Sequence, residues 1–320
     1  MGEIGEVKDD GQVHGDGELG EDYAEHRPLL FSIAYRMTGS VSDAEDIVQE
    51  AFARLAQALR AGTPVSEPRA YLARTATRLA LNHLRSARVH RESYLGTWLP
   101  EPVLTGPGPE EHAEMADSLS MAFLVVLESL SPAERAVFLL HEVFGYEHKE
   151  IAEMTRTSEP NSRQILARAR RHVNEGRPRF ETSRAQREEV ARRFFAAADG
   201  GDLDGLLRAL APDVVYYGDG GGKARAVAAS LHGRERVARF LAGLFRRIRK
   251  LEASLRIVEA NGQPGAVTYD RDGRVVNVFA LDIADGEVQA IRCVVNPDKL
   301  RHLGQVSELA RDLPPEAPLG

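Results

Sequence analysis

The side chains with the most specific chemistry are basic and amide groups repeated along the stretch 146–173. An arginine can donate two hydrogen bonds to guanine, and a glutamine can bond adenine, at the base edges that face the major groove of DNA. At the period of a helix, one face of this stretch carries Arg163, Gln164, Arg170 and Arg171. The chemistry that these residue types offer is recognition of base edges in a duplex.

Two helices and a turn must position that face. A short helix is expected over 148–154, followed by a polar turn over 155–157. Ser158 suits the N-cap of a second helix and Pro160 suits its first turn, where a missing N–H costs nothing. The buried stripe of this second helix consists of Ile165, Leu166, Ala169 and Val173. An arginine row on an isolated helix is more often a solvated surface, but the capped helix and turn before it favour a helix-turn-helix that enters a major groove.

Length and charge limit the class of protein. A chain of 320 residues is long for a single core and suits two or three domains. The formal net charge is −7, yet acidic residues gather in the first 25 positions and arginines in two later blocks. Because the local field decides binding, the acidic total does not exclude nucleic acid as a partner.

Cysteine usage and hydropathy limit the cellular compartments in which we expect the protein. Cys293 is the only cysteine, which excludes an intrachain disulfide and a cysteine-built metal centre. No apolar run is long enough to span a bilayer, and the N-terminus lacks a signal-peptide pattern. We therefore expect a reduced, cytoplasmic protein that binds no membrane, no metal and no cofactor.

The first 23 residues contain almost no large apolar side chains, so residues 1–23 are predicted to be a disordered acidic tail. A helix is expected from near His26 to Gly39, with Pro28 in its first turn. Ser42 and Glu45 then fit a capping box that starts the next helix.

The helix after this capping box has a polar face that needs an explanation. That face carries Asp43, Asp46, Gln49 and Glu50. A helix dipole favours an acidic first turn, which accounts for Asp43 and in part for Asp46. It does not account for Gln49 and Glu50, so this face is a candidate binding surface.

A loop over 61–67 leads to a third helix, with Pro68 in its first turn and arginines on its exposed side. These arginines, opposed only by Glu92, are Arg69, Arg74, Arg78, Arg85, Arg88 and Arg91. A phosphate-contact face and an ordinary arginine-rich surface helix explain this block equally well.

Residues 93–118 are rich in proline and glycine and are predicted to be a linker. Trp98 is the only tryptophan in the chain and would expose a large apolar area, so we expect its ring to dock on a neighbouring surface. Helical periodicity resumes over 119–130, and Ser131 with Glu134 opens a capped helix before the helix-turn-helix.

A separate module follows over 184–302. Two helices at its start bury Val190, Phe194 and Leu206, and a further helix is expected over 234–248. Strand-like runs occur at 214–217, 224–228, 251–259, 266–269, 275–283 and 288–295. This order predicts an α+β domain with one curved antiparallel sheet, followed by a flexible tail over 303–320.

These residues resemble a known family. Residues 24–92 and 119–177 are similar to domains 2 and 4 of an extracytoplasmic-function sigma factor of RNA polymerase, through the phrases DAEDIVQEAFARL, RAYLARTATRLALNHLR and SPAERAVFLLHEVFGYEHKEIAEM. Residues 184–302 resemble a SnoaL-like domain of the NTF2-like superfamily. The subgroup that carries this extension is indicated by the motifs WLPEP at 98–102, DGGGK at 219–223 and NPDKL at 296–300. The resemblance implies two all-α sigma domains, the second a helix-turn-helix, followed by an α+β cone.

The resemblance also implies a role for each exposed face. The acidic-polar face would dock on the coiled coil of the largest polymerase subunit through Asp43, Asp46, Gln49 and Glu50. The second sigma domain would contact the flap of the second-largest subunit. Loop 61–67 would hold an extruded base of the minus-ten element and Asn82 would read a base, while backbone contacts would come from Arg74, Arg78 and Arg85.

The minus-thirty-five element of promoter DNA would be read as duplex by Asn161, Arg163, Gln164, Arg168 and Arg171. At Pro160 and Asn161 the chain departs from the Gly-Thr-Val that is common in the family. The resemblance therefore leaves the preferred sequence open.

Regulation by the C-terminal module, in place of a separate anti-sigma protein, is a further implication, together with a monomeric free chain. The residues concerned are Trp98, Pro100 and Glu101, then Asp219, Gly220, Gly221, Gly222 and Lys223, then Asn296, Pro297, Asp298, Lys299 and Leu300. The alternative function is a SnoaL-type ligand sensor or enzyme with a DNA-binding front end, whose candidate residues are Asp213, Tyr216, Tyr217, Asp219 and His232. Under the sigma-factor reading the protein is not an enzyme and has no catalytic residue.

Overall fold

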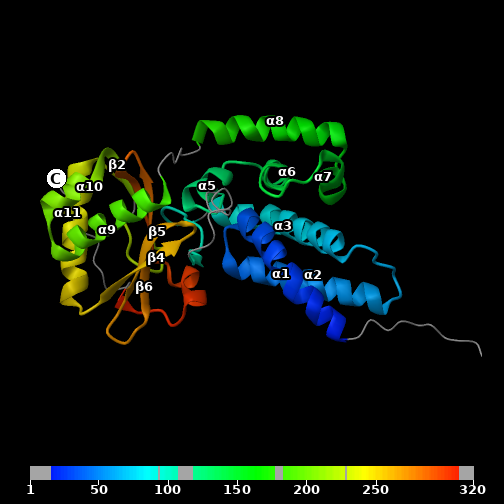
Figure 1. The fold of residues 1–320 in the computed structure, drawn as a ribbon, viewed down its shortest axis with the longest axis horizontal. Coiled ribbons are helices and arrows are strands. Elements are labelled where there is room, and N and C mark those ends of the chain that lie inside the picture. Colours follow the sequence, from blue (N-terminus) through cyan, green and yellow to red (C-terminus); the bar gives the residue numbers. More distant parts are fainter. Residues whose placement is uncertain (1–15, 93, 107–117, 177–182, 228, 310–320) are drawn as a thin grey trace, which may run out of the picture.

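The computed structural model describes residues 16–92, 94–106, 118–176, 183–227 and 229–309. They form a first helical domain (16–92), a second helical domain (118–176) and a C-terminal domain (183–309), joined by a linker of which 94–106 are described. The two helical domains lie together on one side of the molecule, and the sheet of the C-terminal domain lies on the other (Figure 1).

The first helical domain consists of α1 (Asp16–Thr38), α2 (Val41–Arg60) and α3 (Pro68–Glu92). Gly39 ends α1 in a left-handed conformation, as predicted. The helix starts at Asp16, however, so the predicted tail over 1–23 is too long and Pro28 lies inside the helix. Tyr23 anchors this early part against Phe52, with 4.8 Å between the ring centroids. Starting a helix is costly, but each residue added to an existing helix gains one hydrogen bond. The polar segment before Tyr23 can therefore extend α1 without apolar contacts of its own.

The second helical domain consists of α5 (Met121–Leu127), α6 (Pro132–Glu142), α7 (His148–Thr155) and α8 (Glu159–Gly176). The predicted capping box of Ser131 and Glu134 is confirmed at α6. The predicted helix-turn-helix is confirmed as α7 and α8, with Arg156 left-handed in the turn and Ser158 accepting the N–H of Asn161 at 3.3 Å. Helix α5 is shorter than the predicted 119–130: Ser120 caps its start, and residues 128–130 form a tighter turn whose N–H groups bond carbonyls three residues earlier.

The two helical domains share one apolar core. A single cluster of buried side chains runs from α1, α2 and α3 into α5, α6, α7 and α8. Arg78 of α3 also donates hydrogen bonds to the carbonyls of Glu153 and Met154, at 2.7 and 3.1 Å. These carbonyls belong to the last turn of α7, where the helix dipole attracts a cation. The two domains are therefore packed against each other rather than separated.

The C-terminal domain combines helices with a curved sheet. Its elements are α9 (Arg184–Gly200), α10 (Leu203–Ala209), β2 (Leu210–Asp219), β3 (Leu231–His232), α11 (Arg234–Lys250), β4 (Ser254–Ala260), β5 (Gln263–Tyr269), β6 (Val275–Ala284), β7 (Glu287–Val294), η2 (Pro297–Lys299) and η3 (Arg301–Leu303). The strand order is β1-β4-β5-β6-β7-β2-β3. Strand β1 (Leu104–Thr105) comes from the linker and pairs with β4, which the sequence pattern did not predict.

Two predictions for this sheet need correction. Strands β2 and β7 pair in parallel, whereas the other pairs are antiparallel, so the sheet is mixed rather than purely antiparallel. Residues 224–227 form no strand, and Ala228 lies outside the described residues. Strand β2 pairs instead with Leu231 and His232. Ala226 and Val227 lie close to Gly218, so they cover the end of the sheet rather than join it.

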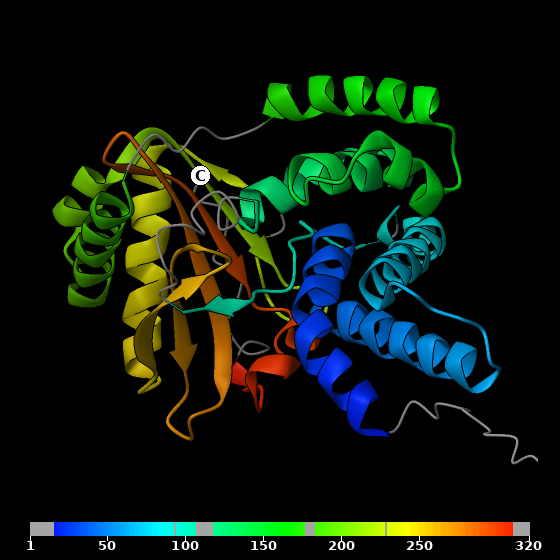
Figure 2. The same cartoon turned by 45° about the vertical axis from the view of Figure 1, so that its right-hand side comes forward.

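The two faces of the sheet bury different partners. Helices α9, α10 and α11 cover one face, where Phe245 of α11 stacks on Phe279 of β6 (Figures 1 and 2). The other face carries Val267, Val278 and Val294 in a second cluster. That cluster also contains Leu99 of the linker and Met121 of α5. The outer face of the sheet is therefore the platform on which the linker and the second helical domain rest.

Residues 303–309 also belong to the fold. Val275 donates its N–H to the carbonyl of Gln305 and accepts the N–H of Ser307, both at 2.8 Å. The C-terminal domain therefore extends beyond residue 302, and the predicted flexible tail starts too early; residues 310–320 lie outside the described part. Within the described ranges, no helix is long and apolar enough to cross a membrane.

Candidate nucleic-acid and interdomain interfaces

Helix α8 presents its predicted recognition face to solvent. The exposed side chains are Asn161, Arg163, Gln164, Arg168 and Arg171. The stripe of Ile165, Leu166, Ala169 and Val173 is buried, as its spacing predicted. Arg163 pairs with Glu159 at 2.5 Å, and Arg168 lies 3.6 Å from Glu134. The Arg163–Glu159 pair is exposed and contributes little, and Arg168 is exposed although Glu134 is mostly covered, so both guanidinium groups are accessible to another partner.

The polar face of α2 is also exposed. Asp46, Gln49 and Glu50 are exposed, and Asp43 is partly covered by His83, 3.3 Å away. Glu50 forms an exposed pair with Arg54 at 2.8 Å. The four residues therefore form one accessible acidic and amide surface.

The predicted capping box of α2 is wrong. Ser40 is the N-cap and accepts the N–H of Asp43 at 3.1 Å, two residues ahead of the predicted Ser42. Glu45 instead pairs with Arg27 of α1 at 2.5 Å. Arg27 of α1 therefore binds the Glu45 carboxylate, which the local pattern had assigned to the helix cap.

The polar face of α3 has an exposed part and a part that is bound to α7. Asn82 and Arg85 are exposed, and Arg74 lies over the ring of Tyr71 at 5.8 Å. Arg78, in contrast, is held on the carbonyls at the end of α7, and its desolvation there lowers the pKa of the guanidinium. The packed arrangement thus removes Arg78 from the surface that the resemblance assigns to DNA.

A buried ion pair lies where the linker meets the C-terminal domain. Asp219, at the end of β2, is fully buried. Its carboxylate accepts hydrogen bonds from the N–H of Leu99 at 2.8 Å, from Lys299 Nζ at 2.7 Å and from the hydroxyl of Tyr94 at 2.5 Å. Lys299 also donates to the carbonyl of Leu99 at 2.5 Å. One buried ion pair therefore holds the main chain of the linker from both sides.

Aromatic rings enclose this ion pair. Lys299 Nζ lies 4.7 Å from the ring centre of Tyr94 and 4.5 Å from that of Trp98, which are cation–π distances. Burial and the neighbouring carboxylate of Asp219 raise the pKa of Tyr94, so its hydroxyl stays a donor. The prediction that Trp98 docks on a neighbouring surface is confirmed. Its ring also lies against Gly39, where an added Cβ would come within 2.7 Å of a ring carbon.

Glu101 of the linker caps a helix of the first domain. Its carboxylate accepts the N–H groups of Val41 and Ser42 at 2.7 and 3.3 Å, and the hydroxyl of Ser40 at 3.0 Å. Its own N–H donates to the carbonyl of Gly39 at 2.8 Å. A carboxylate at a helix N-terminus is stabilised by the exposed N–H groups and by the dipole. The linker is therefore attached to the start of α2.

The other two motifs meet around Asp219. Gly220 starts the turn that closes onto Lys223, and Gly221 and Gly222 have φ of 56° and 70°. A Cβ at Gly221 would lie 2.1 Å from the side-chain nitrogen of Asn296, so only glycine fits that approach. Three further contacts join the motifs: Asn296 N–H to the Asp219 carbonyl, Asn296 Nδ2 to the Tyr94 hydroxyl, and Lys223 to Asp298.

The remaining motif residues contribute to packing or to local structure. Pro100 packs near Gly39, Pro297 starts η2 and Leu300 is buried in the cluster on the outer face of the sheet. Tyr94 was not singled out from the sequence, although it contacts both other motifs. An aromatic residue just before the tryptophan motif was the only local signal.

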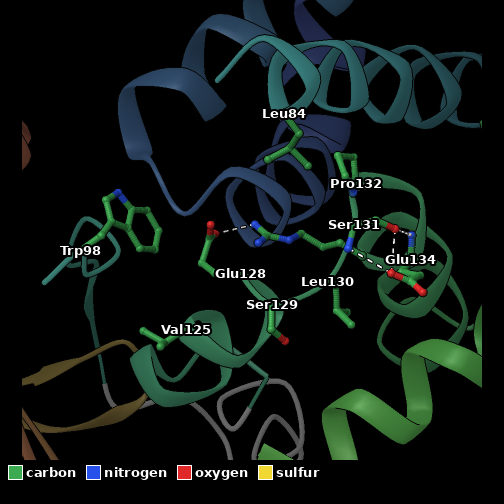
Figure 3. Close-up of a pocket in the computed structure, with 10 residues that line it drawn as sticks. Leu84, Trp98, Val125, Glu128, Ser129, Leu130, Ser131, Pro132 and Glu134 are labelled. Carbon is green, nitrogen blue, oxygen red and sulfur yellow. Dashed lines mark hydrogen bonds and ion pairs between the residues drawn. The ribbon is translucent and has the colours of Figure 1, made fainter. Parts of the chain in front are cut away.

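A cavity of about 580 Å³ lies beside Trp98, between α3, the linker and the start of α6 (Figure 3). Leu84, Val125 and Leu130 supply much of its apolar wall. The buried Arg135 at its side donates to the carbonyls of Leu127 and Met37 and pairs with Glu128 at 2.6 Å. The walls of this cavity thus come from both helical domains and the linker together.

The residues of the enzyme alternative do not converge. Tyr216 and Tyr217 are adjacent on β2 and point to opposite faces of the sheet. Tyr216 contacts Phe240 on the helix-covered face, whereas Tyr217 lies under Arg292 on the outer face. Asp213 and His232 are exposed, and Asp219 binds the linker. The five side chains therefore form no common site.

Comparison with known proteins agrees with the division of the chain into two helical domains and a C-terminal domain. The model of Sigma-70 region 2 matches residues 23–89, that of Sigma-70, region 4 matches 120–173, and that of the SnoaL-like domain matches 191–295. The sigma factor SigJ of Mycobacterium tuberculosis is 39% identical over 285 residues, covering 85% of this chain and 90% of SigJ. The chain belongs to the extracytoplasmic-function sigma factors with a SnoaL-like C-terminal domain.

Two further comparisons support the assignment of this sigma factor. SigI of Mycobacterium tuberculosis, described as a probable sigma factor of the same class, is 33% identical over 282 residues, covering 86% of this chain and 92% of SigI. The crystal structure of Mycobacterium tuberculosis SigJ matches with a TM-score of 0.69 at 37% identity, covering 88% of this chain and 98% of that one. As a sigma factor, the protein binds core RNA polymerase and promoter DNA and directs promoter-specific initiation of transcription.

Replacing Asp219 by alanine is expected to release the linker of this sigma factor. The change leaves the ammonium of Lys299 buried without its counterion, which costs about 3–5 kcal/mol of the docked arrangement. Because Trp98 is the only tryptophan, its fluorescence emission should shift to the red and become more sensitive to acrylamide. Asp213→Ala, an exposed position on the same strand, is the control. Identical emission from both variants would contradict the proposed role of the ion pair.

Proposed function

We propose that this sigma factor reads its promoter through two separate surfaces. Helix α8 reads the minus-thirty-five element, and α3 with the loop before it captures the minus-ten element through Arg74, Asn82 and Arg85. Arg78 joins this set when α3 separates from α7, which holds its guanidinium in the packed arrangement. The acidic-polar face of α2 docks on the coiled coil of the largest polymerase subunit, and the second helical domain on the flap of the second-largest subunit. The free factor is a monomer that works in the cytoplasm. The observation that carries the proposal is the exposed Arg and Gln face of α8 on a helix-turn-helix.

We further propose that the SnoaL-like domain regulates the factor by holding it closed. The two promoter elements, named minus-ten and minus-thirty-five, lie about 25 base pairs apart, which at about 3.4 Å per pair is roughly 85 Å. In the structure α3 is in direct contact with α7, and the two helical domains share one core. The two surfaces cannot span that distance while packed in this way, so they must separate when a promoter is bound. The contacts of Trp98 and Glu101 with the first helical domain resist that separation.

Run-off transcription with purified core polymerase is the direct test of the function. A sigma factor should give transcripts from a defined start only when core enzyme and factor are both present. Its affinity for promoter DNA should rise when core enzyme is added. Tight binding of the free chain to a two-fold symmetric duplex, with no gain from core enzyme, would favour the DNA-binding sensor instead.

Reversing the charges of Asp46 and Glu50 to lysine is expected to weaken the complex with core polymerase by at least about tenfold. Both side chains are exposed, so the variant should keep the melting temperature of the wild type. Glu188→Lys with Glu189→Lys, on the exposed side of α9, makes the same change in charge elsewhere and should bind normally. Equal co-purification of the two variants with core enzyme would remove the assignment of this face.

Alanine at Arg163, Gln164 or Arg171 should each cost about 1–3 kcal/mol of promoter binding if the side chain contacts a base edge. The size of the loss should depend on the sequence of the upstream element. Transcription from a panel of promoters that vary only in this element measures that dependence. Arg192→Ala, an exposed arginine of α9, is the matched control. A uniform loss on every promoter would identify phosphate contacts instead.

Removing residues 296–320 is expected to raise run-off transcription several-fold. The truncation deletes Lys299 and Asn296, which hold the linker on the C-terminal domain. A shorter truncation of 308–320 keeps the pairing of Ser307 with Val275 and should leave transcription unchanged. If both truncations gave wild-type transcription, regulation by the fused domain would be wrong.

A further inference from the structure

The hairpin between β4 and β5 has a buried tip. Ala260 pairs with Gln263, so Asn261 and Gly262 form a two-residue turn, with φ of 54° and 69°. Asn-Gly is the preferred dipeptide for such a turn, because both positions need a positive φ. Tips of hairpins normally face solvent. Asn261, however, is fully buried.

Asn261 contacts three separate parts of the chain. It exchanges two hydrogen bonds with Val103 of the linker, donating its main-chain N–H at 2.8 Å and accepting at Oδ1 at 3.0 Å. Its side-chain Nδ2 donates to the carbonyl of Leu119, just before α5, at 3.1 Å. The same nitrogen donates to the hydroxyl of Tyr35 in α1 at 2.7 Å. One side chain of the C-terminal domain thus binds the linker and both helical domains.

The contact with Tyr35 continues to the start of α2. Tyr35 is fully buried and donates its hydroxyl hydrogen to the carbonyl of Glu101 at 2.6 Å. The carboxylate of Glu101 caps α2. Burial raises the pKa of Tyr35 far above its ordinary value, so the hydroxyl remains a donor. Tyr35 and Glu101 therefore connect Asn261 to the helix that carries the acidic-polar face, through hydrogen bonds to the carbonyl and to the carboxylate of Glu101.

We propose that Asn261 is a positioning residue through which the SnoaL-like domain sets the closed arrangement of the two helical domains. This role rests on the proposed regulation by that domain, but Asn261 lies outside the three sequence motifs and on a different end of the sheet platform from Asp219. It would act as a second, independent attachment. The linker is fixed at Leu99 by Asp219 and at Val103 by Asn261.

The chemistry of asparagine fits all these contacts at once. Its amide offers an acceptor to Val103 and donors to Leu119 and Tyr35. An aspartate at this position would keep the acceptor but place a carboxylate oxygen against the carbonyl of Leu119. A glycine would lose the side-chain contacts but keep the turn, because glycine adopts a positive φ without strain.

The chain provides a matched control for a glycine substitution. Asp285 and Gly286 form the equivalent turn between β6 and β7, with φ of 52° and 76°. Asp285 is exposed. Asn261→Gly and Asp285→Gly therefore change the same turn position in the same domain, and only the first removes interdomain contacts.

The test measures the closed arrangement in the full-length protein. Fluorophores on Glu67→Cys and Asn174→Cys, two exposed positions in different helical domains, report the distance between these domains by single-molecule energy transfer. The native Cys293 is buried, and burial raises its pKa to about 12, so it should not react with the labels. Asn261→Gly should shift the ratio of closed to open molecules by about tenfold or more toward the open form, since several buried hydrogen bonds are lost. Asn261→Asp should shift it at least as far, and Asp285→Gly should not shift it.

Run-off transcription by the same variants separates the two proposals. We expect Asn261→Gly to raise transcription and Asp285→Gly to leave it unchanged. If Asp219→Ala opened the domains and raised transcription while Asn261→Gly matched Asp285→Gly, the role of Asn261 would be wrong and regulation by the fused domain would stand. If none of these variants changed transcription, the regulatory proposal itself would fail. If Asn261→Gly raised transcription without any change in energy transfer, Asn261 would not act by positioning the domains.

Discussion

The docking of the linker on the C-terminal domain depends on one buried carboxylate. Asp219 has no access to water, and an unpaired charge in such a place would cost several kcal/mol. Two of its partners, Leu99 N–H and Tyr94, belong to the linker, and the third, Lys299, belongs to the end of the C-terminal domain. The carboxylate can be satisfied fully only when the linker lies on the sheet. Burying the pair does not by itself stabilise the fold greatly, but it fixes where the linker must be.

Once the linker is fixed, the place of the first helical domain follows. Trp98 fills the space next to Gly39, and Glu101 supplies the acceptor that the first N–H groups of α2 need. A capping contact of this kind contributes about 0.5–2 kcal/mol. Coupling between sites typically amounts to about 1–3 kcal/mol, or 5- to 150-fold. The regulation that we propose for the SnoaL-like domain therefore needs only a few contacts of ordinary strength to change how accessible α2 and α3 are.

Local patterns predicted the helices well because helix signals are local. The capped start of α6 and the buried stripe of α8 follow from residues within two turns of each other. The same pattern failed at Ser42 and Glu45, because Arg27 and Glu101 supplied tertiary partners that no local rule contains. The parallel pairing of β2 with β7, and the strand that the linker adds as β1, escaped prediction for the same reason. Each depends on a segment distant in the sequence.

The candidate sites differ in the same way: those that depend on local pattern were predictable, and those that depend on distant segments were not. The α8 face was predictable because its function needs exposure and helical periodicity, which are both visible in the sequence. The partners of Asn261 lie 142, 158 and 226 residues away, so the sequence shows a good turn dipeptide and nothing of its contacts. Because the domains are tethered, even weak contacts of this type are mostly formed in the free chain. Under the proposed regulation they still give way when core polymerase and promoter bind, because each is small compared with a protein–DNA interface. Two separate attachments of the linker, at Leu99 and Val103, therefore suit the proposed closed state, which forms in the free chain and opens on binding.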